Sequence, residues 1–282
     1  MSDLALPGLD QAHGSVNSRK QFLPREYAAD GDYRPNGRLD GLVALVTKAD
    51  SEISRAIAVC FAREGARVAL CYFESLQDAY ETRRLVRACG ADCVLLAGDP
   101  ADRDTCLRIV ENVVSELGGL DILVNNAGED AMLPNSTRES GRAGFSPRHA
   151  FAYLYLMTAA LPYLPMDGSI INVGCAADAE HEWKTPQQAA ARGSVQGLTR
   201  AFSRAAALRG IRVNAAMVGD LAAGTAAAVS TPQEAERFGE ERLPGRRGRP
   251  CESAPAFVFL VSRDASMTGQ TIHINAGGQI SA

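Results

Sequence analysis

The sequence predicts an α/β protein with a doubly wound parallel sheet of about seven strands. From about Gly41 onward, short runs of β-branched and aliphatic residues alternate with longer amphipathic, Ala-rich segments. Several of the longer segments also end with a glycine just beyond their last apolar position, as helix C-termini prefer. Strands that alternate with helices in this way form a parallel sheet whose two faces are both covered.

Seven apolar runs are expected to be the strands of this sheet. Each run is short and almost continuously hydrophobic, which is typical of strands buried on both faces. In chain order the runs span residues 42–47, 67–73, 93–98, 121–128, 169–174, 211–219 and 270–278. Because ligands of such sheets bind at the carboxyl ends of the strands, we expect the functional site at that edge.

The segments between the runs are expected to be helices. Residues 54–66, 76–90 and 104–118 carry apolar residues at helical spacing. The most apolar stretch, from Phe151 to Met166, is shorter than the ~18–20 residues of a membrane span and contains Pro162 and Pro165. We therefore interpret it as a buried helix.

The first part of the chain differs in composition from the rest. Residues 1–38 hold prolines and glycines among dispersed charges, with no apolar periodicity. We predict an irregular N-terminal arm for residues 1–38 and one domain for residues 39–282. A chain of 282 residues is long enough for one large domain with a substantial core.

The net charge and the distribution of cysteines exclude several classes of partner and site. The 33 acidic and 29 basic residues give a net charge of −4, so no basic surface indicates nucleic acid or an anionic membrane as a partner. The 7 cysteines are scattered, without the C-x-x-C pairs of zinc or redox sites, and the N-terminus lacks the pattern of a secretory signal. We expect a cytoplasmic protein with reduced thiols, no metal and a small-molecule substrate.

The order and spacing of several segments resemble the short-chain dehydrogenase/reductase family, a single-domain Rossmann fold. The similar segments are L-V-A-L-V-T at 42–47, D-I-L-V-N-N-A-G at 121–128, I-R-V-N-A at 211–215 and the closing block at 267–278. The resemblance covers residues 39–282. A long N-terminal arm is found in family members whose arms lie across neighbouring subunits, so the resemblance implies a homo-oligomer, either a dimer or a tetramer.

The chain departs from the family at the glycine motif after the first strand. The family has T-G-x-x-x-G-x-G there, and the glycines let the backbone approach a dinucleotide's diphosphate. Here Lys48, Glu52 and Ser54 fill the three glycine positions. The Glu52 carboxylate would repel a diphosphate by roughly 1 kcal/mol at ~4 Å even in water. We therefore expect no bound cofactor. If NAD or NADP binds after all, the residues ending the second strand (71–73) include no acid and indicate no preference between them.

The family's catalytic positions also differ. The resemblance places Cys175, Gln188 and Arg192 where the family has serine, tyrosine and lysine, and His149 where it has an active-site asparagine. The family's tyrosine is the general acid/base. An amide has no usable pKa near neutrality, so Gln188 cannot perform that role.

These four residues are nevertheless the candidate catalytic residues. Arg192 could hold a carboxylate, phosphate or enolate with its planar donor fork, Gln188 could donate to a carbonyl, and His149 could act as acid or base. Cys175 is either a thiolate activated by His149 or Arg192, or a small apolar filler. Arg192 and Gln188 could equally be an interface residue and a solvated one.

From these departures we expect a protein that has lost NAD(P)-dependent redox chemistry. It would use the old cleft for a cofactor-independent cyclisation, isomerisation, elimination or decarboxylation of a small carbonyl-bearing compound of specialised metabolism. Such reactions need orientation, a proton acceptor and an oxyanion partner rather than a redox group. Two alternatives remain open. One is a non-catalytic partner subunit of an active family member, and the other is an atypical NAD(P)-dependent oxidoreductase.

Overall fold

The computed structural model describes residues 33–126, 148–175, 186–219 and 248–275. Most of the predicted arm lies outside these ranges, so its irregular structure stays a prediction. The strands are β1 Val43–Val46, β2 Arg67–Tyr72, β3 Cys93–Ala97, β4 Ile122–Asn125, β5 Ser169–Cys175, β6 Arg212–Val218 and β7 Thr271–Ile274. The helices are α2 Glu52–Arg63, α3 Leu76–Ala88, α4 Arg103–Leu117, α5 Arg148–Ala160, α6 Pro186–Ala207 and α8 Pro250–Val261.

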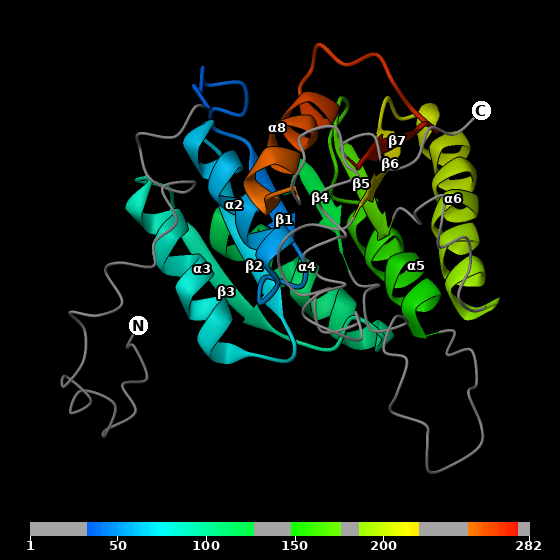
Figure 1. Ribbon diagram of the computed structural model, residues 1–282, viewed down its shortest axis with the longest axis horizontal. Helices are drawn as coiled ribbons and strands as arrows, with labels where there is room; N and C mark the ends of the chain where they lie inside the picture. The colour runs from blue at the N-terminus through cyan, green and yellow to red at the C-terminus, as the bar shows by residue number, and fades with distance from the viewer. Residues whose placement is uncertain (1–32, 127–147, 176–185, 220–247, 276–282) are drawn as a thin grey trace, which may run out of the picture. The chain divides into compact units, whose positions relative to one another are not determined.

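All seven described strands belong to one parallel sheet (Figure 1). Their order is β3-β2-β1-β4-β5-β6-β7, so the direction of winding reverses between β1 and β4. This confirms the predicted doubly wound sheet. In such folds ligands bind in a crevice outside the carboxyl ends of the strands at this reversal, here β1 and β4.

Helices cover both faces of the sheet. Helix α2 packs on α3 and α8, whereas α5 packs on α4 and α6. Both sets are visible in Figure 1 as two groups of adjacent helices. The carboxyl ends of the strands and the amino ends of the helices that follow them therefore lie at one edge of the molecule.

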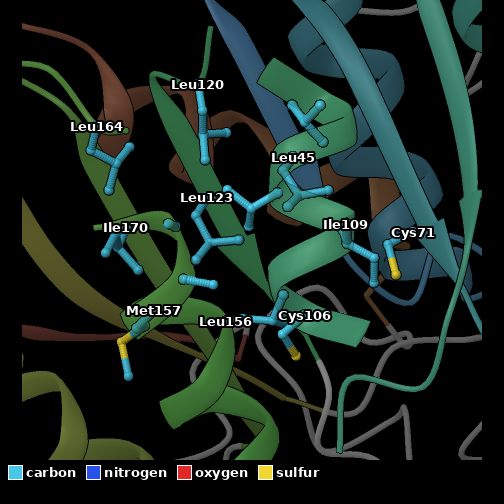
Figure 2. Packing of buried hydrophobic residues seen from close by; sticks show 14 of the residues in the cluster. Leu45, Cys71, Cys106, Ile109, Leu120, Leu123, Leu156, Met157, Leu164 and Ile170 are labelled. Carbon is cyan, nitrogen blue, oxygen red and sulfur yellow. The ribbon is translucent and has the colours of Figure 1, made fainter. Parts of the chain in front are cut away.

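The core beneath α4 and α5 is built from apolar side chains of the central strands (Figure 2). Leu45 of β1, Leu123 of β4 and Ile170 of β5 are completely buried and face Ile109 of α4 and Leu156 of α5. Burying each such side chain stabilises the fold by about 1.5–3 kcal/mol. This rigid layer fixes the positions at which the strands end.

Three cysteines are part of the buried interior. Burial raises the pKa of the Cys71, Cys93 and Cys106 thiols to about 12. The pKa of Cys71 is raised further by the neighbouring Cys106. Both cysteines belong to the apolar core described above. These thiols are therefore protonated at neutral pH and pack as small apolar groups.

The helix expected from Phe151 to Met166 is shorter than predicted at its end. Helix α5 stops at Ala160, and Met166 is 76% exposed. Pro162 explains the stop, because proline lacks the N–H that a helix needs and disfavours helical geometry in the residue before it. Among the described helices, none has the length and hydropathy needed to cross a membrane.

Candidate functional site

Hydrogen bonds lock the ends of β1 and β4 together at the winding reversal. The backbone N–H of Asn126 donates to Oγ1 of Thr47 at 2.8 Å, and the N–H of Thr47 donates to the carbonyl of Val124 at 3.1 Å. Both Thr47 and Asn126 are buried. The polar side chains that follow the two strands thus form a fixed floor for the crevice.

Ser54, at the family's third glycine position, belongs to the same floor. Its hydroxyl donates to the carbonyl of Thr47 at 2.7 Å and accepts from Nδ2 of Asn126 at 2.8 Å. The side chain is completely buried. Sequence reasoning treated Ser54 as an obstacle in the crevice, but its hydroxyl faces the strand ends and ties α2 to them.

The other two glycine positions are filled in different ways. Lys48 has a φ of 52°, in the left-handed region that glycine adopts most easily, so the turn keeps the backbone shape of a glycine with a lysine in its place. Glu52 is the first residue of α2 and its side chain is exposed. Its carboxylate therefore contributes negative charge at the helix end without filling a buried space.

Sequence reasoning missed Asp50, which lies in the turn after β1. The N–H of Ala49 donates to the carbonyl of Cys71 at 2.9 Å, and this bond holds the turn beside the end of β2. Oδ2 of Asp50 then accepts from the backbone N–H groups of Glu74 and Ser75, both at 2.9 Å. Oδ1 of Asp50 is buried and accepts no hydrogen bond from the described residues. No local pattern reveals this, because the partners are more than twenty residues away.

The four residues predicted from the sequence come to the same edge of the sheet. Cys175 is the last residue of β5 and pairs with Val218 of β6. Gln188 lies in the first turn of α6, Arg192 follows one turn later and is half-buried, and His149 is the second residue of α5. The side chains of Cys175, Gln188 and His149 lie outside the described parts of the structure, so their roles stay predictions.

A further histidine, His273, lies near Arg192. His273 is on β7, beside Met217 of β6 in the strand register. Its Nδ1 is buried and has no hydrogen-bond partner among the described residues. Burial lowers the pKa of His273, and the positive charge of Arg192 lowers it further. The charge of Arg192 therefore reaches the β7 end of the site.

The described residues include no group of three or more His, Cys, Asp or Glu side chains that could hold a metal ion.

Comparisons with known proteins match most of the chain. A family profile described as "Enoyl-(Acyl carrier protein) reductase" matches residues 48–279. The chain is 36% identical over 271 residues to "Uncharacterized oxidoreductase YhdF" of Bacillus subtilis (strain 168), covering 94% of this chain and 92% of the relative. It is 31% identical over 264 residues to "NADPH-dependent aldehyde reductase 1, chloroplastic" of Arabidopsis thaliana, covering 90% and 92%.

A solved structure is also similar. The structure of a short chain dehydrogenase from Burkholderia cenocepacia J2315 in complex with NADP has a TM-score of 0.69 and 26% identity, covering 86% of this chain and 99% of that one. These comparisons contradict two of our expectations, the loss of NAD(P)-dependent redox chemistry and the absence of a cofactor, because the relatives are named as oxidoreductases and the neighbour holds NADP. The residue changes in the glycine motif were overweighted: Ser54, at least, is turned toward the sheet. By its family profile, its relatives and its fold, the chain belongs to the short-chain dehydrogenase/reductase family.

Proposed function

We propose that this protein is a nicotinamide-dependent oxidoreductase that interconverts a small carbonyl compound and the corresponding alcohol. We further propose that it does so with a divergent set of residues at the family's glycine and catalytic positions. The observation that carries the proposal is the inward hydrogen bonding of Ser54, which directs its side chain toward the ends of β1 and β4.

The residues around this turn fit a dinucleotide in two respects. Lys48 keeps the left-handed backbone of the first glycine position. The amino end of α2 presents backbone N–H groups, which favour a phosphate. Glu52 opposes binding through its charge, so we expect a weaker affinity than a glycine would give.

The nicotinamide supplies or accepts the hydride when it is bound. The protein's own residues then have to orient the substrate oxygen and move one proton to or from it. We assign the proton transfer to His149, whose unperturbed pKa of ~6.5 suits a step near neutrality. We assign the stabilisation of the substrate oxygen to the guanidinium of Arg192, with Gln188 as a second donor and Cys175 as a wall of the cleft.

The experiment has two stages. Calorimetric titration of the full chain with NADH and with NADPH should give a dissociation constant on the order of micromolar for at least one of them. Addition of a panel of aldehydes and ketones should then oxidise the bound coenzyme in the absence of any other protein. Lack of binding by either coenzyme would reject the proposal, and turnover by this chain alone would reject the idea of a non-catalytic partner subunit.

The variants Arg192→Ala and His149→Ala test the assigned roles. Loss of one group that stabilises or protonates the transition state lowers kcat/KM by about 10²-fold or more. Arg200→Ala is the matched control, because Arg200 lies on the exposed part of the same helix. Unchanged kcat/KM in both site variants would contradict the assignment.

We also propose a homo-oligomer and a cytoplasmic location, as expected from the sequence. Phe151 on α5 is 43% exposed and stacks on Tyr155 with ring centroids 5.7 Å apart, which gives this helix an apolar surface. Exposed aromatic surface is enriched at subunit interfaces. Light scattering coupled to gel filtration should give the mass of a dimer or tetramer, whereas a mass near 29.9 kDa would exclude both.

A further inference from the structure

A buried hydrogen bond ties helix α6 to strand β5. Nδ2 of Asn172, on β5, donates to Oγ1 of Thr199, on α6, at 3.0 Å. Both side chains are completely buried. Apolar packing has no preferred direction, whereas a hydrogen bond holds its atoms within a narrow range of distance and angle. This bond therefore fixes the rotation of α6 about its own axis.

Arg192 lies on the same face of α6 as Thr199. The two residues are about two helical turns apart, or about 10 Å along the axis. Val195 lies between them on this face and is buried. It approaches β5 where Gly174 has no side chain, since a Cβ at Gly174 would lie 3.6 Å from Cγ1 of Val195. The face of α6 that packs on the sheet thus continues from Thr199 to the half-buried Arg192, at the edge where β5 ends.

The position of Arg192 can be detected on β7. Met217 of β6 packs against Gly174, with Sδ 2.5 Å from the place of a Cβ there, and Met217 is also beside His273 in the strand register. The packing that holds α6 on β5 therefore extends to His273. Burial lowers the pKa of His273, and the positive charge of Arg192 lowers it further. The titration of His273 thus reports where the guanidinium lies.

Strand β5 also holds α5, the helix that bears His149. The hydroxyl of Tyr153 on α5 donates to the carbonyl of Val173, which follows Asn172 on β5. Nδ2 of Asn125 on β4 donates to the carbonyl of Tyr153 at 3.2 Å. His149 lies one turn before Tyr153, and α5 and α6 are neighbours (Figure 1). The two helices that bear the assigned residues are therefore both anchored to one strand by buried polar groups.

On the premise of the proposed function, we infer that Asn172 and Thr199 are positioning residues: their hydrogen bond sets the rotation of α6 and so directs Arg192 at the substrate oxygen. Neither residue touches the substrate, because both side chains are completely buried. Thr199 is the principal partner of the Asn172 amide, since its other acceptor on a helix, Sδ of Met157 at 3.4 Å, is a weak one. Losing the hydroxyl of Thr199 therefore releases the rotation of α6.

Thr199→Val tests this in the full chain, because valine has nearly the same shape as threonine without the hydroxyl. NMR titration with isotope-labelled histidine should show the pKa of His273 rising toward its ordinary value, as it should in Arg192→Gln. The signal of His273 is identified by its absence in His273→Gln. With the coenzyme and carbonyl substrate found above, kcat/KM should fall by about tenfold, mainly through kcat, because a misdirected guanidinium stabilises the transition state less.

Two further variants separate positioning from a general loss of stability. Thr199→Ser keeps the hydroxyl and should keep both the His273 pKa and kcat/KM of the wild type. Ser203→Ala is the matched control, because it removes a buried hydroxyl one turn later on α6 that donates within the helix, to the carbonyl of Arg200 at 2.9 Å. It should leave both quantities unchanged. Thr199→Ala removes the same hydroxyl as Thr199→Val and replaces it if the valine variant does not fold.

The outcomes separate this inference from the proposed function. A His273 pKa that rises in Arg192→Gln but not in Thr199→Val would overturn the inference, and so would an equal rise in Ser203→Ala. An unchanged pKa in Arg192→Gln would also overturn it, because α6 would then not place Arg192 near His273. A raised pKa with an unchanged kcat/KM in Thr199→Val would remove the role in the reaction. A raised pKa in Thr199→Val, with no turnover by the wild type, would support the control of Arg192 by Thr199 and reject the proposed function.

Discussion

The side-chain amide of Asn126 donates to the hydroxyl of Ser54 at 2.8 Å and thereby joins the end of β4 to the first helix of the domain. The same hydroxyl donates to Thr47, at the end of β1. Three segments that are far apart in the sequence therefore depend on one buried oxygen. This contact adds to the backbone hydrogen bonds that join the ends of β1 and β4, and it can be tested directly.

Ser54→Ala should lower the free energy of unfolding by about 1–3 kcal/mol, because it leaves the buried amide of Asn126 and the carbonyl of Thr47 with one partner fewer. Thr158→Ala removes a hydroxyl from an exposed helix position and should cost less than about 0.5 kcal/mol. Urea denaturation followed by circular dichroism measures both. If both variants lost the same free energy of unfolding, the buried hydrogen bonds of Ser54 would contribute no more than one exposed hydrogen bond within a helix.

Lys48→Gly should be more stable than Lys48→Ala by about 1 kcal/mol. Glycine accepts the φ of 52° without strain, whereas alanine keeps the Cβ that makes this region unfavourable. Both variants lose the interactions of the lysine side chain, so their difference isolates the backbone effect. Thermal and chemical denaturation of the pair provide the measurement, and an alanine variant as stable as the glycine variant would argue against the strain.

Glu52→Gln should raise coenzyme affinity about fivefold, since it removes roughly 1 kcal/mol of repulsion between the carboxylate and a bound diphosphate. The effect should fade as salt is added, because exposed charges are screened. Glu111→Gln on the exposed face of α4 is the charge-matched control. Calorimetric titration at low and high ionic strength is the measurement, and an affinity that does not change at low salt would place Glu52 away from the bound diphosphate.

Gly219→Ala should destabilise the protein by about 2 kcal/mol or more. A Cβ at Gly219 would lie 2.6 Å from Cβ and 2.9 Å from Cα of Asn275, so the ends of β6 and β7 would have to separate. Gly193→Ala, by contrast, meets open space on α6 and should stabilise the protein by about 0.5–1 kcal/mol through helix propensity. Chemical denaturation should therefore show that the two substitutions change the free energy of unfolding in opposite directions. A Gly219→Ala variant as stable as the wild type would contradict the close approach of the two strands.

His273 should make stability depend on pH in a defined direction. Its pKa in the folded protein lies below 6.5, because of burial and the charge of Arg192, so the unfolded chain binds the proton more readily. The contribution is therefore fully present above about pH 6.5 and is lost as pH falls below it toward the folded pKa. The free energy of unfolding, measured from pH 7.5 down to 5, should fall less steeply in His273→Gln than in the wild type. Arg192→Gln should also reduce the slope, and parallel curves for all three proteins would contradict the coupling.

Much of the fold could be predicted from the sequence because its signals are local. Six of the seven runs of apolar residues contain their strand, and β5 extends one residue beyond its run to Cys175, since burial on both faces leaves a continuous hydrophobic pattern. The predicted end of α5 was too late in the chain because the apolar run continues past Pro162. The prediction followed the apolar composition and gave too little weight to the backbone constraint of this proline.

The site was harder to predict because its contacts are between distant segments. Ser54 was interpreted from its position in a motif, yet the direction of its hydroxyl depends on Asn126, 72 residues later. Asp50 could not be identified from a local pattern, because the N–H groups that it accepts belong to Glu74 and Ser75 of a distant turn. The Asp50 carboxylate and the Asn126 amide meet their partners because of the order of the strands in the sheet. A pattern within a single sequence does not contain that order.

The reactivity of the buried cysteines can report how often the folded protein opens. A thiol with a pKa near 12 is ionised in only about one molecule in 10⁵ at neutral pH. An alkylating reagent can modify Cys71, Cys93 and Cys106 only while the surrounding layers come apart. Peptide mapping separates the adducts on these three cysteines from those on the half-buried Cys89 and Cys251. The rate at which the three buried thiols are modified then reports how often the sheet is exposed, without any introduced label.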